Sequence, residues 1–487
     1  METRPSSRTA LPVHLAAIFA GKIDGRTENV RYRQQQFHRL HKAIITSLTE
    51  IKEALVRDSG HQHHEVQAEL HQALREITTH YRSLNLEEAI GKEYRVAHGQ
   101  DNRDGRRGVG IVYIIPGGHN LFYSLVACIS AAVAAGNCIV VELPRTTLQL
   151  PELLRRVLSN ALDRDTFTFT EERPDATVLQ DMFVVCQDQS NSTELGSQLA
   201  LVSPNGLRTV AVVDRTAQVE VAAQELGLAR FLFRGQSPYA PDLVLVNEFC
   251  VEQFLEALLK YAAKGLGLGR CDDVPAVPRR GKTPSQLDRL SAEEGTQVVV
   301  SGSDWGIAIV HDRHSTLLST KINERLLLIH TVTSLDDAIN FCNSTSTLAA
   351  TYTFSAPAAA KYVSESIDAH LSWINHIPYD MLVGPVLPAQ YPLNTETRYT
   401  VEMFEVPRPQ IISPTASTMT SASILKRKGI DAQIEERIQA PLPALQQRPG
   451  HRVGFFEQGL ISGGLVALTP LAGFVLLGAY RVFSTRK

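Results

Sequence analysis

The chain has 487 residues, of which 44% are apolar and 20% are charged, enough apolar material for large cores in two or three domains. Its formal net charge of −3 excludes the strongly basic balance that is typical of a nucleic-acid-binding domain. We therefore expect a globular protein with no nucleic-acid partner.

Six cysteines are scattered along the chain without a CxxC pair. This usage indicates neither a disulfide scaffold nor a structural zinc site, and it fits a reducing compartment. Residues 1–16 lack the long apolar stretch of a secretory signal, so none is predicted.

Two amphipathic helices are predicted at the start of the fold. Their apolar residues recur at steps of three and four, which places them on one face of each helix. The first stripe contains Phe37, Leu40, Ile44, Leu48, Ile51 and Leu55, and the second contains Val66, Leu70, Leu74, Ile77 and Tyr81.

A βαβ unit follows these helices. A β-rich run at 108–115 ends at Pro116-Gly117-Gly118, an apolar helix covers about 121–135, and a second strand covers 138–141. Two further strands are predicted at 182–186 and 209–213, with a helical stretch at 195–201. This alternation predicts a doubly wound parallel sheet in the first half of the chain.

A second α/β domain is predicted after the loop 235–242, which reads Gly-Gln-Ser-Pro-Tyr-Ala-Pro-Asp. Strands and helices alternate again here. They are the strand 243–246, the helix 251–263, the strand 307–310, the helix 335–342 and the strand 351–354.

Residues 459–480 form a run of 22 residues without a charge. As a helix this run would be about 33 Å long, at roughly 1.5 Å per residue, which is enough to cross the hydrocarbon core of a bilayer. We predict a C-terminal transmembrane anchor that holds a cytosolic domain on the endoplasmic reticulum or another organelle membrane. A buried core helix is the alternative interpretation.

Several motifs follow one another in order along the chain, namely 110–115, Ala134-Ala135-Gly136-Asn137, Gly235-Gln236 with Ala240-Pro241-Asp242, 334–339, and Trp373-Ile374-Asn375. Together they resemble the aldehyde dehydrogenase superfamily. Phe19-Ala20-Gly21-Lys22 and the apolar C-terminal segment are most similar to the class-3 branch, which includes membrane-bound fatty aldehyde dehydrogenases.

The resemblance implies a Rossmann-like α/β fold, an NAD cofactor and a bridging hairpin that builds dimers. The implied parts are the N-terminal helices and cofactor-type domain at 15–230, and a catalytic-type α/β domain with the end of the hairpin at 231–412. A linker at 413–458 and the anchor at 459–480 follow.

The chemistry of the family does not carry over residue by residue. By the resemblance, the nucleophilic cysteine falls on Pro238, which has no side-chain group that can attack a carbonyl. The oxyanion-holding asparagine falls on His119, with Asn120 one place away, and the acid that binds the nicotinamide ribose falls near Lys321. The segment with the general-base glutamate is missing, and the glycine-rich phosphate turn is replaced by residues 214–218.

Other residues with reactive side chains also have ordinary structural interpretations. Cys250 is expected to be a packed core thiol, and Ser237 is a nucleophile only if a base lies against it. His119 is either an acid, base or hydrogen-bond donor, or a polar residue at a helix N-terminus. His61, His63 and His64 are expected in a solvated loop, so no metal site is predicted.

Glu142 ends the second strand, where Rossmann folds place an acid on the adenosine ribose. It is a candidate for residual NAD binding, and its negative charge disfavours NADP. We expect a membrane-anchored accessory protein without the cysteine-dependent reaction, with pathway enzymes or a lipophilic ligand as partners. The resemblance suggests a fungal secondary-metabolite pathway. The alternative is NAD-dependent oxidation of a lipophilic aldehyde by non-standard residues.

Overall fold

The structure is a computed structural model. It describes residues 12–188, 200–265, 286–290, 293, 295–388, 390–426, 431–446, 454 and 457–470. The chain divides into two compact units, Met1–Ser413 and Pro414–Lys487, and the fold described below is that of the first unit.

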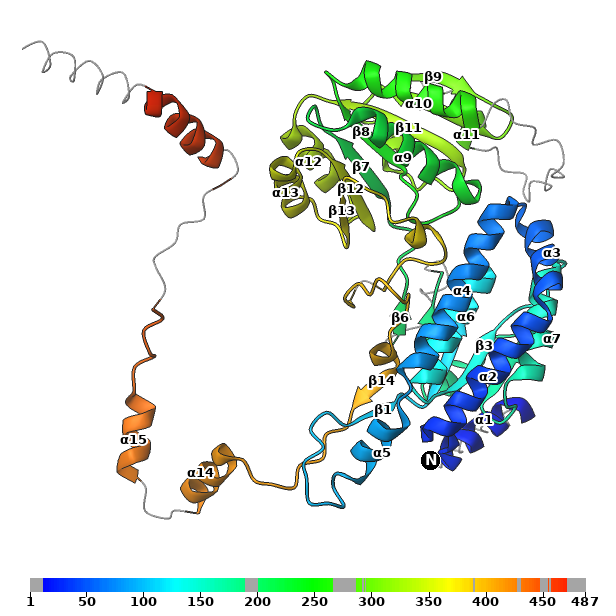
Figure 1. Cartoon of the computed structure of the whole chain (residues 1–487), viewed down its shortest axis with the longest axis vertical. Coiled ribbons are helices and arrows are strands. Elements are labelled where there is room, and N and C mark those ends of the chain that lie inside the picture. Colours follow the sequence, from blue (N-terminus) through cyan, green and yellow to red (C-terminus); the bar gives the residue numbers. More distant parts are fainter. Residues whose placement is uncertain are drawn as a thin grey trace, which may run out of the picture. The chain divides into compact units, whose positions relative to one another are not determined.

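Helices form the N-terminal part of this unit (Figure 1). Most residues of the predicted stripes are buried, whereas Leu48, Leu74 and Tyr81 are partly buried. The first stripe is divided between α2 and α3 at Ser47. Asn29 caps α2 by accepting hydrogen bonds from the N–H groups of Arg31 and Tyr32. The helices are α1 Val13–Asp24, α2 Val30–Thr46, α3 Leu48–Ser59, α4 His63–Ser83 and α5 Leu86–Tyr94.

A parallel sheet of five strands has the order β4-β3-β2-β5-β6. The predicted βαβ unit is confirmed as β2, α6 and β3. Every residue of β2 is buried because α1 covers one face of the sheet and α6 the other. The elements are β2 Ile111–Ile115, α6 Leu121–Ala134, β3 Cys138–Glu142, α7 Gln149–Ala161, β4 Phe167–Thr170, α8 Ala176–Leu179, β5 Phe183–Cys186 and β6 Ala200–Val202.

A second sheet of seven strands has the order β13-β12-β7-β8-β11-β10-β9, and β9 is its antiparallel edge. The strands are β7 Thr209–Val213, β8 Leu243–Asn247, β9 Thr296–Ser301, β10 Trp305–Val310, β11 Arg325–Val332, β12 Ala350–Phe354 and β13 Ser372–Ile374. The helices of this sheet are α9 Val219–Phe231, α10 Val251–Gly265, α11 Gln286–Leu290, α12 Leu335–Asn343 and α13 Pro357–Ser366.

Two assignments made from the sequence are wrong. The strand 209–213 lies in the middle of the second sheet, as β7 between β12 and β8, and not in the first sheet. The local pattern of a buried parallel strand is the same in both sheets, so it does not decide between them. Within the predicted helix 195–201, residues 200 and 201 begin strand β6, and 195–199 lie outside the described residues.

A short ribbon pairs β1, Arg106–Gly108, with β14, Glu405–Pro407, in antiparallel register. In the second unit, the predicted linker contains two helices, α14 Ala416–Leu425 and α15 Asp431–Gln439, and residues 457–470 are helical. Among the described residues, no helix has both the length and the apolar character that a membrane crossing requires. Residues 471–480 of the predicted anchor lie outside the described part, so the anchor stays a prediction.

Candidate functional site

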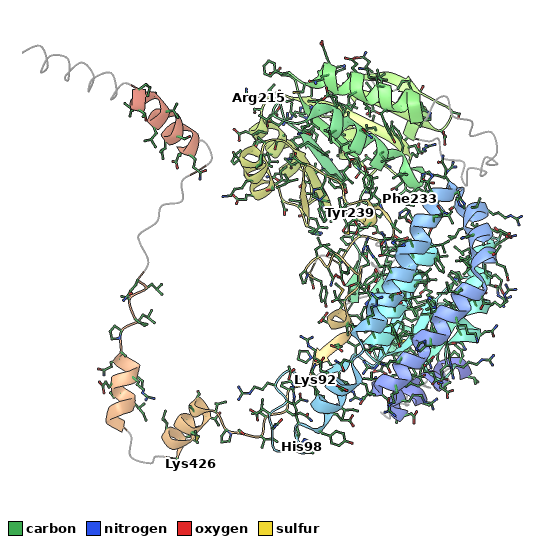
Figure 2. The ribbon with its side chains drawn as sticks, in the orientation of Figure 1. Lys92, His98, Arg215, Phe233, Tyr239 and Lys426 are labelled. Carbon is green, nitrogen blue, oxygen red and sulfur yellow. The ribbon has the colours of Figure 1, made fainter. Side chains whose placement is uncertain are left out.

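The loop 235–242 begins in an unusual backbone conformation. Phe233, Arg234 and Gly235 have φ angles of 50°, 55° and 69°, all in the left-handed region. This conformation costs about 1–2 kcal/mol for each residue that has a side chain. The Glu65 carboxylate at the start of α4 holds the turn by accepting a hydrogen bond of 2.6 Å from the Phe233 N–H. Figure 2 shows Phe233 near this end of α4.

Pro238 lies beside a lysine. The Lys321 ammonium group donates a hydrogen bond of 2.6 Å to the Pro238 carbonyl oxygen, and the Thr209 hydroxyl donates a second of 3.1 Å. Lys321 also contacts Asp242, with 2.9 Å between Nζ and Oδ2. Its side chain is 12% exposed. Burial lowers the pKa of Lys321, and the nearby Asp242 acts in the opposite direction.

Asp242 and Arg230 tie this loop to its surroundings. Asp242 accepts hydrogen bonds from the Thr209 and Ile322 N–H groups at 2.7 and 3.0 Å. Arg230 is completely buried, lies 3.4 Å from Asp242, and donates to backbone carbonyl oxygens that include those of Gly235 and Ile322. The loop is therefore held by a buried group of two cations and one carboxylate.

Among the described residues, no cysteine thiol is activated for nucleophilic attack. Cys250 is 6% exposed, which confirms the expected packed thiol, and burial raises its pKa. The other described cysteines are also buried, with thiol pKa values raised by burial, and they are Cys128, Cys138, Cys186 and Cys342. Cys271 lies outside the described residues. Ser237 is buried, and its hydroxyl contacts no base among the described residues.

His119 and Asn120, the candidates for holding an oxyanion, both bind protein groups. His119 donates from Nε2 to the Leu382 carbonyl oxygen at 2.9 Å, and burial lowers its pKa to about 4. The Asn120 amide donates to Glu69 at 2.7 Å, and its oxygen accepts from the Gly384 N–H at 3.2 Å. One donor of each side chain is therefore already used within the protein and is not available to an oxyanion.

The expectation of a solvated histidine loop is wrong for His61. This residue is 3% exposed, and its ring lies 5.4 Å from that of Phe233. Burial lowers its pKa to about 3, so the imidazole is neutral. His63 and His64 are exposed at the start of α4. The described residues contain no group of three or more His, Cys, Asp and Glu side chains that could hold a metal ion.

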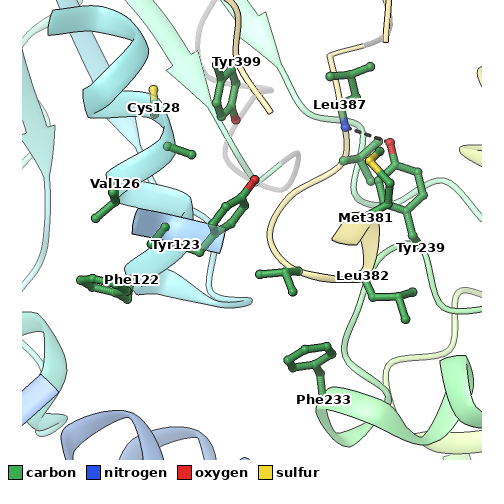
Figure 3. Close-up of a cluster of buried hydrophobic side chains, with 14 of the residues drawn as sticks. Phe122, Tyr123, Val126, Cys128, Phe233, Tyr239, Met381, Leu382, Leu387 and Tyr399 are labelled. Atoms are coloured by element: carbon green, nitrogen blue, oxygen red, sulfur yellow. Dashed lines mark hydrogen bonds between the residues drawn. The ribbon is translucent and has the colours of Figure 1, made fainter. Parts of the chain in front are cut away.

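Sequence reasoning missed a buried polar network between α4, α6 and the C-terminal part of the first unit. Glu76 accepts hydrogen bonds from the Tyr123 hydroxyl at 2.9 Å and from the Arg398 N–H at 2.7 Å. The Arg398 guanidinium lies over the rings of Tyr123 and Tyr239, 5.8 and 5.9 Å from their centroids. Figure 3 shows the Tyr239 hydroxyl accepting a hydrogen bond from the Leu387 N–H.

A signal for this network was present in the sequence. Glu69 and Glu76 follow Val66 and Ala73 by three residues and fall on the apolar stripe of α4. Charged residues are almost never fully buried unless they are paired. Their position on a stripe that must be buried indicates internal hydrogen-bonded carboxylates.

The described residues do not fit a dinucleotide as the resemblance implies. Glu142 accepts hydrogen bonds from the Tyr113 hydroxyl at 2.7 Å and from Arg173 at 3.0 Å, so its charge is already paired. This pairing removes the argument against NADP. Residues 214–218 follow β7 in the second sheet, and therefore they do not replace a phosphate turn of the first sheet. The nicotinamide cofactor is implied by relatives and not by this geometry.

The relatives and solved structures most similar to this chain include several aldehyde dehydrogenases. No protein-family model matches the sequence. The chain is 23% identical over 357 residues to the dimeric NADP-preferring aldehyde dehydrogenase of Rattus norvegicus, across 68% of this chain and 78% of that protein. It is 24% identical over 361 residues to aldehyde dehydrogenase family 3 member B1 of Rattus norvegicus, across 68% and 75%.

A bacterial relative and a solved structure extend this likeness. The chain is 23% identical over 362 residues to the 4,4'-diaponeurosporen-aldehyde dehydrogenase of Staphylococcus aureus, across 68% of this chain and 77% of that protein. The substrate-bound structure of Staphylococcus aureus AldH superposes with a TM-score of 0.67 at 17% identity, across 85% of this chain and 98% of that one. The chain is thus related to the aldehyde dehydrogenases, family 3 members among them, and it has their fold.

Proposed function

We propose that this protein binds a lipophilic aldehyde without the cysteine-dependent dehydrogenase reaction, as an accessory protein of a pathway that handles such compounds. The proposal is carried by Pro238, on which the sequence resemblance places the nucleophile of the family, and whose carbonyl oxygen is bound by Lys321. A proline ring offers no group that can form the covalent intermediate of that reaction.

The other side chains to which the resemblance assigns a role support this proposal. The Asn120 amide and the His119 imidazole are used in internal hydrogen bonds, and Glu142 is paired with Arg173. The ligand class is inferred from the relatives, whose names include the 4,4'-diaponeurosporen-aldehyde dehydrogenase. The pathway that we propose is one of fungal secondary metabolism, as the sequence resemblance suggests.

A second candidate is the oxidation of a lipophilic aldehyde with NAD or NADP by non-standard residues. It is favoured by the likeness to dehydrogenases, one of them NADP-preferring, over about two thirds of the chain. This candidate requires a nucleophile or hydride path other than the one the family uses.

One experiment separates the two candidates. The full chain is purified in detergent and supplied with NAD or NADP and a long-chain aldehyde, and the formation of reduced cofactor is followed by absorbance. The proposal predicts binding of the aldehyde, measured by calorimetry, without cofactor reduction. Cofactor reduction that persists after Cys250→Ala and Cys271→Ala would establish the second candidate, and loss of reduction in either variant would identify an unexpected thiol.

We also propose that residues 459–480 anchor the protein to an organelle membrane and that the first unit faces the cytosol. The support is the uncharged run of 22 residues. Removal of 459–487 should move the protein from the pelleted to the soluble fraction after cell lysis. A truncated chain that still pellets, while remaining folded by circular dichroism, contradicts the anchor.

A homodimer is proposed from the ribbon of β1 and β14. Three apolar side chains in or after this ribbon are half exposed, namely Val406 at 45%, Ile411 at 54% and Ile412 at 46%. Exposed apolar patches mark interaction sites, and burying them in a second copy removes them from water. Light scattering should report a dimer that Val406→Arg weakens, whereas a wild-type monomer contradicts it.

A further inference from the structure

A lysine lies where the resemblance places the acid that binds the nicotinamide ribose. The Lys321 ammonium contacts the backbone of Pro238, the residue in the nucleophile's place, and it contacts the Asp242 carboxylate. We propose that Lys321 captures an aldehyde as a protonated imine, with Asp242 as its counter-ion. This inference rests on the proposed function, because it names the residue by which the aldehyde is held.

The position of Lys321 distinguishes it from surface lysines. Lys260 and Lys361 are 68% and 69% exposed, and each is near a glutamate on its own helix. Lys321 is 12% exposed, and its contacts with Pro238 and Asp242 use two of its three N–H donors. Its side chain is therefore largely, but not completely, removed from water.

The buried surroundings of Lys321 favour its neutral amine more than the surroundings of an exposed lysine do. Burial is the largest cause that lowers the pKa of Lys321, and the nearby guanidinium groups of Arg230 and Arg208 lower it further. Asp242 raises the pKa of Lys321 and limits the shift. Each unit by which a pKa falls increases the fraction of neutral amine at neutral pH about tenfold.

The reaction balances with groups that are present. The Lys321 ammonium transfers a proton to Asp242, and the amine forms a C–N bond to the aldehyde carbon while the C–O π bond opens. The attacking nitrogen then gives one of its two protons to the carbonyl oxygen, which forms a carbinolamine. The carbinolamine loses its hydroxyl group as water with a proton supplied by Asp242, and a second proton remains on the imine nitrogen. The sum is an ammonium and an aldehyde giving an iminium and water, with no oxidant or reductant.

The test uses the full chain in detergent with all-trans-retinal as the probe. Its conjugation makes a protonated imine visible as a shift of the absorption maximum to longer wavelength. Sodium cyanoborohydride then reduces the imine to a stable amine, and peptide mass spectrometry locates the adduct. We expect more adduct at Lys321 than at the exposed Lys361, because Lys321 lies beside Asp242 and is largely buried.

Two variants serve as controls, and both are checked for folding by circular dichroism. Lys361→Arg should retain the shifted absorption, and Lys321→Arg should lose it while keeping a positive charge beside Asp242. The adduct map of the wild-type chain decides the question even when Lys321→Arg fails to fold. Adducts that are equal at Lys321 and at exposed lysines, or that are absent at Lys321, overturn the inference.

These outcomes are separate from those of the proposed function. Retinal that binds without any adduct at Lys321 overturns the imine and leaves aldehyde binding intact. Reduction of NAD or NADP in the presence of retinal overturns the proposed function, whatever the adduct map shows. A chain that binds no aldehyde overturns both.

Discussion

The buried carboxylate of Glu69 should make the stability of this protein depend on pH in an unusual direction. Glu69 is completely buried in α4 and accepts hydrogen bonds from the Asn120 amide at 2.7 Å and the Tyr123 N–H at 3.3 Å. Burial is the dominant cause that raises its pKa from 4.5 to about 7, and these hydrogen bonds limit the rise.

The folded state therefore holds the Glu69 proton more tightly than the unfolded state does. Its contribution to stability is fully present below pH 4.5 and is lost as the pH rises through about 7. At roughly 1.4 kcal/mol per pKa unit, the loss is about 3 kcal/mol. Glu69→Gln keeps the size of the side chain and removes the charge, so this variant should lack the loss.

The assay is urea unfolding followed by circular dichroism, at steps from about pH 5 to about pH 8, where this linkage acts. The measured quantity is the difference in unfolding free energy between wild type and Glu69→Gln. His61 and His119 titrate in both proteins and cancel in this difference. Glu53→Gln, at an exposed position of α3, is the matched control. A difference that stays constant across the pH range refutes the reasoning.

Three further predictions concern the loop around Pro238. Gly235→Ala should lower the melting temperature far more than Gly25→Ala. Both glycines have a positive φ, but only at Gly235 does an added Cβ meet a backbone oxygen, that of Glu324 at 2.3 Å. Equal losses of melting temperature in the two variants contradict this prediction. Asp242→Asn leaves Arg230 buried without its carboxylate, so the free energy of unfolding measured in urea should fall by about 3–5 kcal/mol. A fall of less than about 1 kcal/mol contradicts the stabilising role of the buried cluster. Pro238→Cys should not restore the reduction of NAD or NADP with any aldehyde, because the Asn120 amide stays bound to Glu69. Measurable cofactor reduction by this variant contradicts the prediction.

Local patterns in the sequence determined much of the fold. The apolar stripes of α2, α3 and α4, the βαβ unit from β2 to β3 and the helix α12 are set by the spacing of apolar residues within one element. The absence of a nucleophile at Pro238 also follows from the sequence, because it depends on one side chain within a motif.

The tertiary structure alone decided which distant groups meet. The assignment of β7 to the second sheet depends on pairing with β12 and β8, and no periodicity encodes that choice. Lys321 and Asp242 are 79 positions apart, and their contact appears only when β8 and the segment before β11 are brought together. Burial then sets the charge behaviour of Lys321, Glu69 and His61, since the cost of ionisation depends on the water that the folded chain excludes.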